Sequence, residues 1–135
     1  MKVFLGGTCN KSLWRDGVER VLTSFNIDFF NPVVKDWTPK YQEEERLQRN
    51  ICDFVMYTIT PRMSGVYSIA EVVDDSNKRP EKTILVILNE DYGVEPFSEG
   101  QLKSLKTVGE MVIKNGGAVF YNLLDACSFL VGKNK

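Results

Sequence analysis

The chain has 135 residues, of which 43% are hydrophobic, enough for one compact domain with a core and too few for two. Its 17 basic residues nearly balance 18 acidic ones, so the net charge of -1 gives no global attraction to a nucleic-acid polymer or an anionic membrane. Without histidine, a CxxC spacing or an apolar run of about 20 residues, a zinc site, a histidine-dependent triad and a membrane helix are disfavoured.

Apolar segments alternate with helical patterns along the whole chain. Strands are expected at "KVFLGG", "IDFFNP", "CDFVMYTI", "KTILVIL" and "GAVFYN", and helices over residues 13–24, 40–50, 67–77, 101–114 and 123–130. Because the strands lack polar alternation, helices should cover both faces of the sheet, as in parallel sheets. We therefore expect one α/β domain over residues 1–135, with a doubly wound five-stranded parallel sheet of flavodoxin-like order 2-1-3-4-5. Ligands bind such sheets at the carboxyl ends of the strands.

The first of these ends is the segment "GGTCNKS", residues 6–12. Its backbone N–H groups and the hydroxyl groups of Thr8 and Ser12 suit a phosphate or sugar oxygen. The segment has neither the dinucleotide-binding nor the Walker glycine spacing. The pair Gly6 and Gly7 is also compatible with a tight turn that binds nothing, which is the commoner role of a glycine pair after a strand.

The second end is "NPVVKDW", where Asp36 precedes Trp37. The indole ring offers a face on which a planar base could stack, or it simply covers the next helix. Thr38 before Pro39 predicts a helix N-cap with proline at the first helical position. Further along, "NGG" at residues 115–117 predicts a helix stop.

The third strand region contains two acidic residues of different character. Asp53 opens the strand at the end away from the expected cleft, which favours a structural role. Glu71 follows the strand, and the pattern Ser68-x-x-Glu71 is that of a capping box. A glutamate at this place is also suited to attack a substrate, because the helix dipole favours its ionised form. The spacing leaves both roles open.

Several motifs together carry a family resemblance that extends over nearly the whole chain. They are the glycine-rich end of the first strand, "FNP" in the second, "CDFVMYTI" in the third, "SIAE" after it, and "KRPEKTILVIL". In these motifs the chain resembles the nucleoside 2-deoxyribosyltransferase-like proteins and their nucleotide N-glycosidase relatives. "NPVVKDWTP" and "GVYSIAEVVDDS" are similar to a branch common in phages and bacteria.

The resemblance implies roles for particular residues. Glu71 matches the nucleophile that attacks the anomeric carbon of the sugar, and Glu45, eight residues before Asp53, matches a second acidic residue. The resemblance implies sugar or phosphate contacts for Gly6, Gly7 and Thr8 and for one serine, either Ser64 or Ser68. The other candidates for substrate binding are Asp36, Trp37, Gly65 and Tyr67. Two positions depart from the family: Phe4 stands where many active members have a tyrosine, and Gly65-Val66-Tyr67 lacks an acidic residue. Tyr67 is a candidate to replace the missing hydroxyl.

The function expected from this resemblance is cleavage or transfer at the N-glycosidic bond of a nucleoside or nucleotide, through a glutamate nucleophile. A second group must protonate the departing base, and Glu45 is the first candidate, ahead of Asp36 and Asp91. Four cations near the expected cleft suit a 5′-phosphate: Lys11, Arg15, Lys35 and Arg62. The alternatives are an NAD or cyclic-nucleotide glycohydrolase and a non-catalytic nucleotide-binding or signal-sequestering protein.

The remaining expectations concern cofactors, location and assembly. We expect no cofactor or metal, no nucleic-acid polymer and no membrane as partners. The unpaired cysteines, and a first strand that begins within the opening residues without a signal sequence, suggest a cytoplasmic protein. The family is commonly oligomeric, so a homodimer or larger homo-oligomer is expected, in which a neighbouring subunit closes each site.

Overall fold

The computed structural model describes residues 1–135 and contains a five-stranded parallel sheet with five α-helices. The elements are β1 (Lys2–Gly7), α1 (Trp14–Ser24), β2 (Asp28–Phe30), α2 (Pro39–Ile51), β3 (Phe54–Ile59), α3 (Tyr67–Lys78), a 3-10 turn (Pro80–Lys82), β4 (Thr83–Ile87), α4 (Glu99–Asn115), β5 (Ala118–Phe120) and α5 (Leu123–Lys133). The strand order β2-β1-β3-β4-β5 confirms the predicted flavodoxin-like topology.

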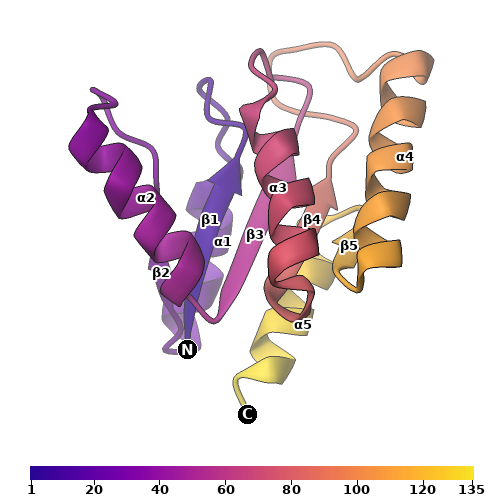
Figure 1. The fold of residues 1–135 in the computed structure, drawn as a ribbon. Coiled ribbons are helices and arrows are strands. Elements are labelled where there is room, and N and C mark those ends of the chain that lie inside the picture. The colour runs from indigo at the N-terminus through magenta and orange to yellow at the C-terminus, as the bar shows by residue number, and fades with distance from the viewer.

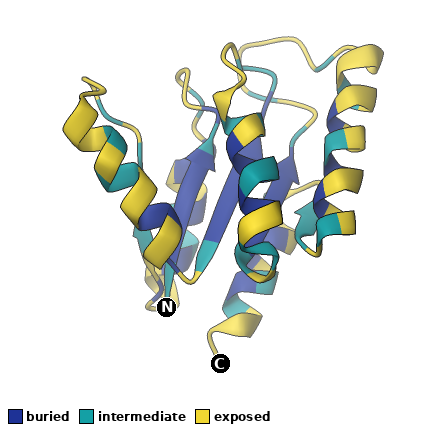
Figure 2. Ribbon diagram, in the orientation of Figure 1, coloured by how far each residue is buried: buried dark blue, intermediate teal, exposed yellow.

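The sheet separates two layers of helices. Helices α1 and α5 lie behind the sheet, and α2, α3 and α4 lie in front of it (Figure 1). Successive strand residues alternate between the two cores: Val3 and Leu5 pack with α1 and α5, whereas Phe4 and Tyr57 pack with α3 and α4. The three central strands β1, β3 and β4 are largely buried while the helices expose their outer faces (Figure 2), which explains why these strand sequences lack polar alternation.

Two helix boundaries confirm the predicted signals. The Thr38 side chain accepts a hydrogen bond from the Tyr41 amide at 3.3 Å, and Pro39 is the first residue of α2. Gly116 follows α4 with a φ of 105°, in the left-handed region that favours glycine. Helix α4 begins at Glu99, earlier than predicted, because Ser98 and Gln101 form a capping box.

The predicted capping box at Ser68 and Glu71 is wrong. Helix α3 already begins at Tyr67, its N-cap is Val66, and no side chain caps it. Glu71 therefore lies beyond the first turn, where its carboxyl cannot reach back to the N-cap amide. Asp53 has the structural contact expected of it, since it accepts the Lys2 amide at 2.8 Å at the opposite end of the sheet.

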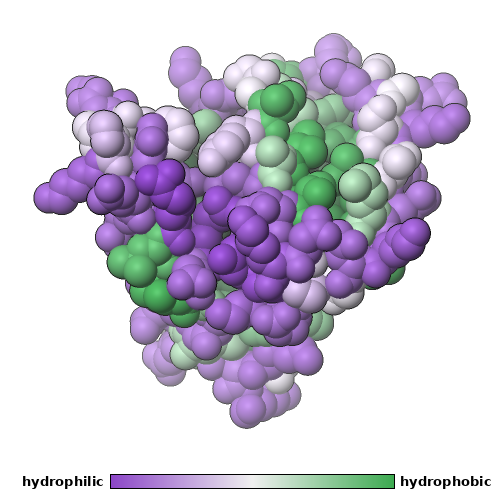
Figure 3. All heavy atoms as spheres, viewed as in Figure 1, coloured by the Kyte–Doolittle hydropathy of each residue, from purple (hydrophilic) through white to green (hydrophobic).

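The front face of the molecule is mainly polar over α2 and the middle of α3, with apolar groups gathered between α3 and α4 (Figure 3). Only Gln48 and Arg49 are buried in α2, so this helix is held to the domain largely by polar side chains. None of the helices has the length and apolar character needed to cross a membrane.

Candidate active site

A pocket of about 280 Å³ opens at the carboxyl ends of β1, β2 and β3. The strand order reverses between β1 and β3, and this is the place where open α/β sheets bind ligands. The pocket is lined by Gly6, Gly7, Cys9, Arg15, Pro32, Val33, Val34, Trp37, Glu45, Tyr67, Ser68 and Glu71. Residues from four separate stretches of sequence thus meet in one hollow.

Most of the predicted site residues lie in this pocket, but four do not: Thr8, Asp36, Ser64 and Gly65. Thr8 is buried beneath the loop, where its hydroxyl accepts the Thr60 amide at 3.0 Å. Ser64 accepts a hydrogen bond from Asn10 at 2.7 Å, which ties together the loops that follow β1 and β3. Asp36 lines a separate hollow on the other side of its loop, and Gly65 is exposed.

The two glycines at the end of β1 are required by close packing. A Cβ at Gly6 would lie 2.6 Å from the Tyr57 ring, and one at Gly7 would collide with the Thr58 carbonyl oxygen. Gly7 also has a φ of 114°, which other residues rarely adopt. The pair is not a tight turn: both glycines belong to the end of β1, where they pair with Tyr57 and Thr58 of β3, and their backbone is one wall of the pocket.

Glu71 and Glu45 project into the pocket from neighbouring helices. Glu71 is 6% exposed, whereas Glu45 is half-buried. Burial, followed by a hydrogen bond with Glu45 and its charge, raises the pKa of Glu71 to about 8. Because this pKa lies above neutral pH, the two carboxyls together retain a proton at pH 7, as an acid–base pair requires.

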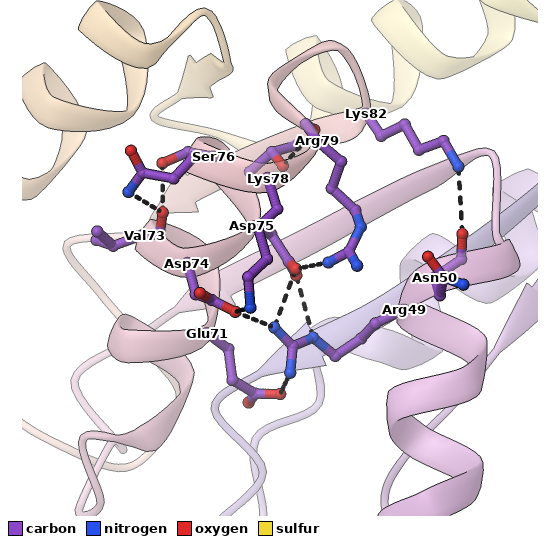
Figure 4. Close-up of polar contacts among 12 residues, drawn as sticks. Arg49, Asn50, Glu71, Val73, Asp74, Asp75, Ser76, Lys78, Arg79 and Lys82 are labelled. Atoms are coloured by element: carbon purple, nitrogen blue, oxygen red, sulfur yellow. Dashed lines mark hydrogen bonds and ion pairs between the residues drawn. The ribbon is translucent and has the colours of Figure 1, made fainter.

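Arg49 lies on the protein side of Glu71. Its Nη1 is 3.5 Å from Glu71 Oε2, an oxygen that is buried and accepts no hydrogen bond. The rest of the guanidinium is bound to Asp75, with Nε at 3.1 Å and Nη2 at 2.9 Å from its oxygens. Figure 4 shows Arg49 reaching from α2 to these acidic side chains on α3. Burial alone would lower the pKa of Arg49, but the bonds to Asp75 raise it, so Arg49 remains a cation.

The predicted cations do not gather in the pocket. Arg15 alone among the four lines it, and the guanidinium donates to the carbonyls of Leu5, Gly7 and Thr8 at 3.0, 3.1 and 2.7 Å. Burial lowers the pKa of Arg15 to about 10, so it stays charged at neutral pH. Three others lie elsewhere: Lys11, Lys35 and Arg62.

Asp91, considered as a proton donor, does not line the pocket either. Partial burial alone would raise the pKa of Asp91, but hydrogen bonds from Ser12 and Thr60, each 2.5 Å long, help to lower it. An acid that stays ionised is a poor proton donor. Asp91 instead ties the loop after β4 to the loops after β1 and β3.

Two aromatic rings stand at the mouth of the pocket. The Trp37 and Tyr67 rings are 6.2 Å apart and tilted by 59°, and more than half of each side chain is exposed. Phe4, in contrast, is fully buried and stacks on Phe30. The buried hydroxyl near Glu71 comes from Tyr57 on β3, which donates to Asp75 at 2.5 Å.

Sequence reasoning missed the polar group behind the pocket, which consists of Arg49, Asp75 and Tyr57. A usable signal was present: Arg49 lies four residues after Glu45, and Asp75 lies four residues after Glu71. Residues spaced by four share one face of a helix, so each pair had to point the same way. No group of three or more histidine, cysteine, aspartate or glutamate side chains is placed to bind a metal ion.

Comparison with known proteins identifies the family. A family model described as "Nucleoside 2-deoxyribosyltransferase like" matches residues 1–92. No curated protein and no solved structure gives a match. The matched segment runs from β1 past β4 and includes every residue that lines the pocket. The chain belongs to the nucleoside 2-deoxyribosyltransferase-like family.

Proposed function

We propose that the protein cleaves the N-glycosidic bond of a nucleoside or nucleotide, or transfers its sugar to another base, with Glu71 as nucleophile and Glu45 as proton donor. The observation that carries this proposal is the meeting of the two carboxyls in a pocket at the switch point of the sheet. Membership of the family supports the substrate class.

In the first step, the ionised Glu71 oxygen forms a bond to the anomeric carbon while the bond from that carbon to the base nitrogen breaks. The bonding electrons leave with the base, and Glu45 delivers its proton to a base nitrogen. The products are the free base, a sugar ester on Glu71 and an ionised Glu45.

In the second step, Glu45 takes a proton from water, whose oxygen attacks the anomeric carbon and releases Glu71 as a carboxylate. Sugar and base are then separate and the enzyme is restored. When a second base attacks in place of water, the result is transfer. Exclusion of water from the pocket decides between the two outcomes.

Substrate recognition would divide between the mouth and the wall of the pocket. The exposed rings of Trp37 and Tyr67 offer faces for a planar base. The Gly6–Gly7 backbone at the end of β1, the Ser68 hydroxyl and the uncapped amides at the start of α3 are suited to sugar or phosphate oxygens.

We also propose that a second copy of the chain covers the mouth of the pocket. Four apolar side chains around it are 48–69% exposed, a gathering typical of an interaction surface: Val33, Trp37, Val66 and Tyr67. Light scattering at micromolar concentration should give a dimer or larger assembly. A monomer would contradict this part of the proposal.

The activity is tested by incubating the protein with each deoxynucleoside, each deoxynucleotide and NAD, and chromatographing the mixture for free base. Release of base by the wild type, and its loss in Glu71→Gln, is the expected result. Glu44→Gln is the matched control and should keep the activity. Glu44 neighbours Glu45 in sequence, but it accepts a hydrogen bond from Gln48 and does not line the pocket.

Two other outcomes would replace the proposal. Tight binding of a nucleotide without released base would indicate a non-catalytic binding protein. Release of nicotinamide alone would indicate an NAD glycohydrolase. Activity of Glu71→Gln equal to the wild type would remove Glu71 from the reaction.

A further inference from the structure

Behind the pocket, Arg49, Asp75 and Tyr57 form a hydrogen-bonded group that has no role in the reaction proposed above. Asp75 is completely buried and accepts from three side chains: Arg49, Arg79 and Tyr57. Burial and the charges of Asp75 and Glu71 raise the pKa of Tyr57 well above its usual range, so its hydroxyl keeps the proton that it donates. The Asp75 carboxylate is therefore held from several sides.

A fixed Asp75 fixes Arg49 in turn. Two guanidinium nitrogens bind the two Asp75 oxygens, and this bidentate geometry allows one orientation of the planar group. In that orientation the remaining nitrogen, Nη1, faces the unpartnered Oε2 of Glu71 (Figure 4). At 3.5 Å it acts on Glu71 through its charge without a hydrogen bond that attack on a substrate would have to break.

We propose that Arg49, Asp75 and Tyr57 position the nucleophile: Asp75 and Tyr57 hold Arg49 in one orientation, in which its charge favours the ionised form of Glu71 while Arg49 makes no hydrogen bond to the attacking carboxylate. This inference rests on the proposed role of Glu71. The three are positioning residues, since the pocket does not expose them to substrate.

The same contact sets the distance between the two working carboxyls. Arg49 lies one turn after Glu45 on α2, and Asp75 lies one turn after Glu71 on α3. Since Arg49 is one of only two buried residues of α2, its bond to Asp75 holds α2 against α3. The bond thereby keeps Glu45 opposite Glu71.

Charge balance also suits a covalent intermediate. Glu71 loses its negative charge when it becomes a sugar ester, and a cation paired with Glu71 alone would then be left buried and unpaired. Arg49 avoids this because it remains bonded to Asp75, with Asp74 a further 3.4 Å contact. The ionisable groups that face Glu71 are Glu45 and Arg49 from α2, Asp75 from α3, Tyr57 from β3 and Arg15 from α1 across the pocket.

The inference is tested by following the Glu71 carboxyl carbon by NMR from pH 4 to 10 in unliganded protein, with Glu71→Gln to assign the signal. In Arg49→Lys, a single ammonium group replaces the guanidinium and is attracted to the buried Asp75. Glu71 then loses its nearby positive charge, so the midpoint of its titration should rise by about one pH unit or more. Tyr57→Phe should raise it by less. Asp53→Asn, which removes an acidic contact at the far end of the sheet, should leave it unchanged.

The pH profile of base release is the second measurement, because a merely structural role would lower activity without moving the profile. Its alkaline limb, which the loss of the same proton sets, should move upward in Arg49→Lys in step with the NMR midpoint. A folded Arg49→Lys protein whose Glu71 titrates as in the wild type would overturn the inference. If Arg49→Lys does not fold, the Tyr57→Phe titration decides, and an unmoved midpoint there overturns it.

The two proposals fail in different ways. A wild-type protein that releases no base from any substrate refutes the glycosidic reaction, whatever the titration shows. A wild-type protein that does release base, together with an Arg49→Lys variant whose Glu71 midpoint is unmoved, refutes only the positioning role.

Discussion

Glu45 on α2 and Glu71 on α3 line the same pocket, although 26 positions separate them in sequence, and Glu45 contributes to the raised pKa of Glu71. A single carboxyl group is either protonated or ionised, whereas a pair of carboxyls can supply an acid and a carboxylate at the same time. The relationship between these two carboxyls determines how the reaction should depend on pH.

The pH profile of base release should therefore be bell-shaped. The pair loses its remaining proton as the pH rises through about 8, so the proton donor is lost and kcat/KM falls. At low pH both carboxyls are protonated and the nucleophile is lost. Glu45→Gln should lower kcat by about 10² to 10⁴ and abolish the alkaline limb. Steady-state rates from pH 5 to 10 measure this, and an alkaline limb that persists in Glu45→Gln would contradict it.

Glu71 should cost stability at alkaline pH. Its pKa is raised in the folded state, so the folded protein binds more protons than the unfolded one between pH 4.5 and 8, and stability falls as pH rises through this window. Glu71→Gln removes the effect. Its advantage in the free energy of unfolding should grow by about 2–4 kcal/mol between pH 5 and 8.5. Urea unfolding at both pH values measures this, and a difference that stays constant would exclude it.

Removal of the Trp37 ring should weaken binding more than chemistry. Trp37 is 54% exposed and lines the pocket, so Trp37→Ala deletes a stacking face without opening the core. KM should rise by about 2- to 12-fold with kcat little changed, as expected for the loss of one aromatic contact. Trp37→Phe should restore most of the affinity. Tyr92→Ala, at an exposed ring outside the pocket, is the control, and an equal rise in KM there would argue against stacking.

Two glycines should respond in opposite ways to alanine. Gly7→Ala forces a Cβ against the Thr58 carbonyl at a positive φ and should destabilise the fold by about 2 kcal/mol or more. Gly65→Ala meets open space and should be neutral, or stabilising by up to about 1 kcal/mol. Denaturant midpoints compare the two. Equal effects would mean that the end of β1 at Gly7 is not constrained as described.

The fold could be predicted from the sequence because the local signals for strands, helix starts and helix stops agree with one another. The apolar strand segments, the Thr38–Pro39 helix start and the Gly116 helix stop all have their predicted roles. The edge strands β2 and β5 are shorter than their apolar segments, because each is paired with a neighbour on one side only. At Ser68, a four-residue pattern alone could not show that the N-cap lies two residues earlier, at Val66.

The site was accessible only in part. Glu45 and Glu71 were matched through the family resemblance, since no local pattern brings α2 and α3 together. The cations were misjudged because proximity to a strand end does not fix side-chain direction: Arg62 donates to the Tyr92 carbonyl at 2.7 Å, and Arg15 to its own loop. The buried position of Arg49 was not predicted, because a charged residue on a helix usually points to solvent.

The most direct test of the account is to quench the wild-type protein with acid during turnover of its best substrate and map the peptides by mass spectrometry. The account predicts a sugar ester, with the mass of the free sugar less one water, on the peptide that carries Glu71. It also predicts no such ester in Glu71→Gln. An ester on another residue, or rapid turnover with no ester on any peptide, would contradict the nucleophilic role of Glu71.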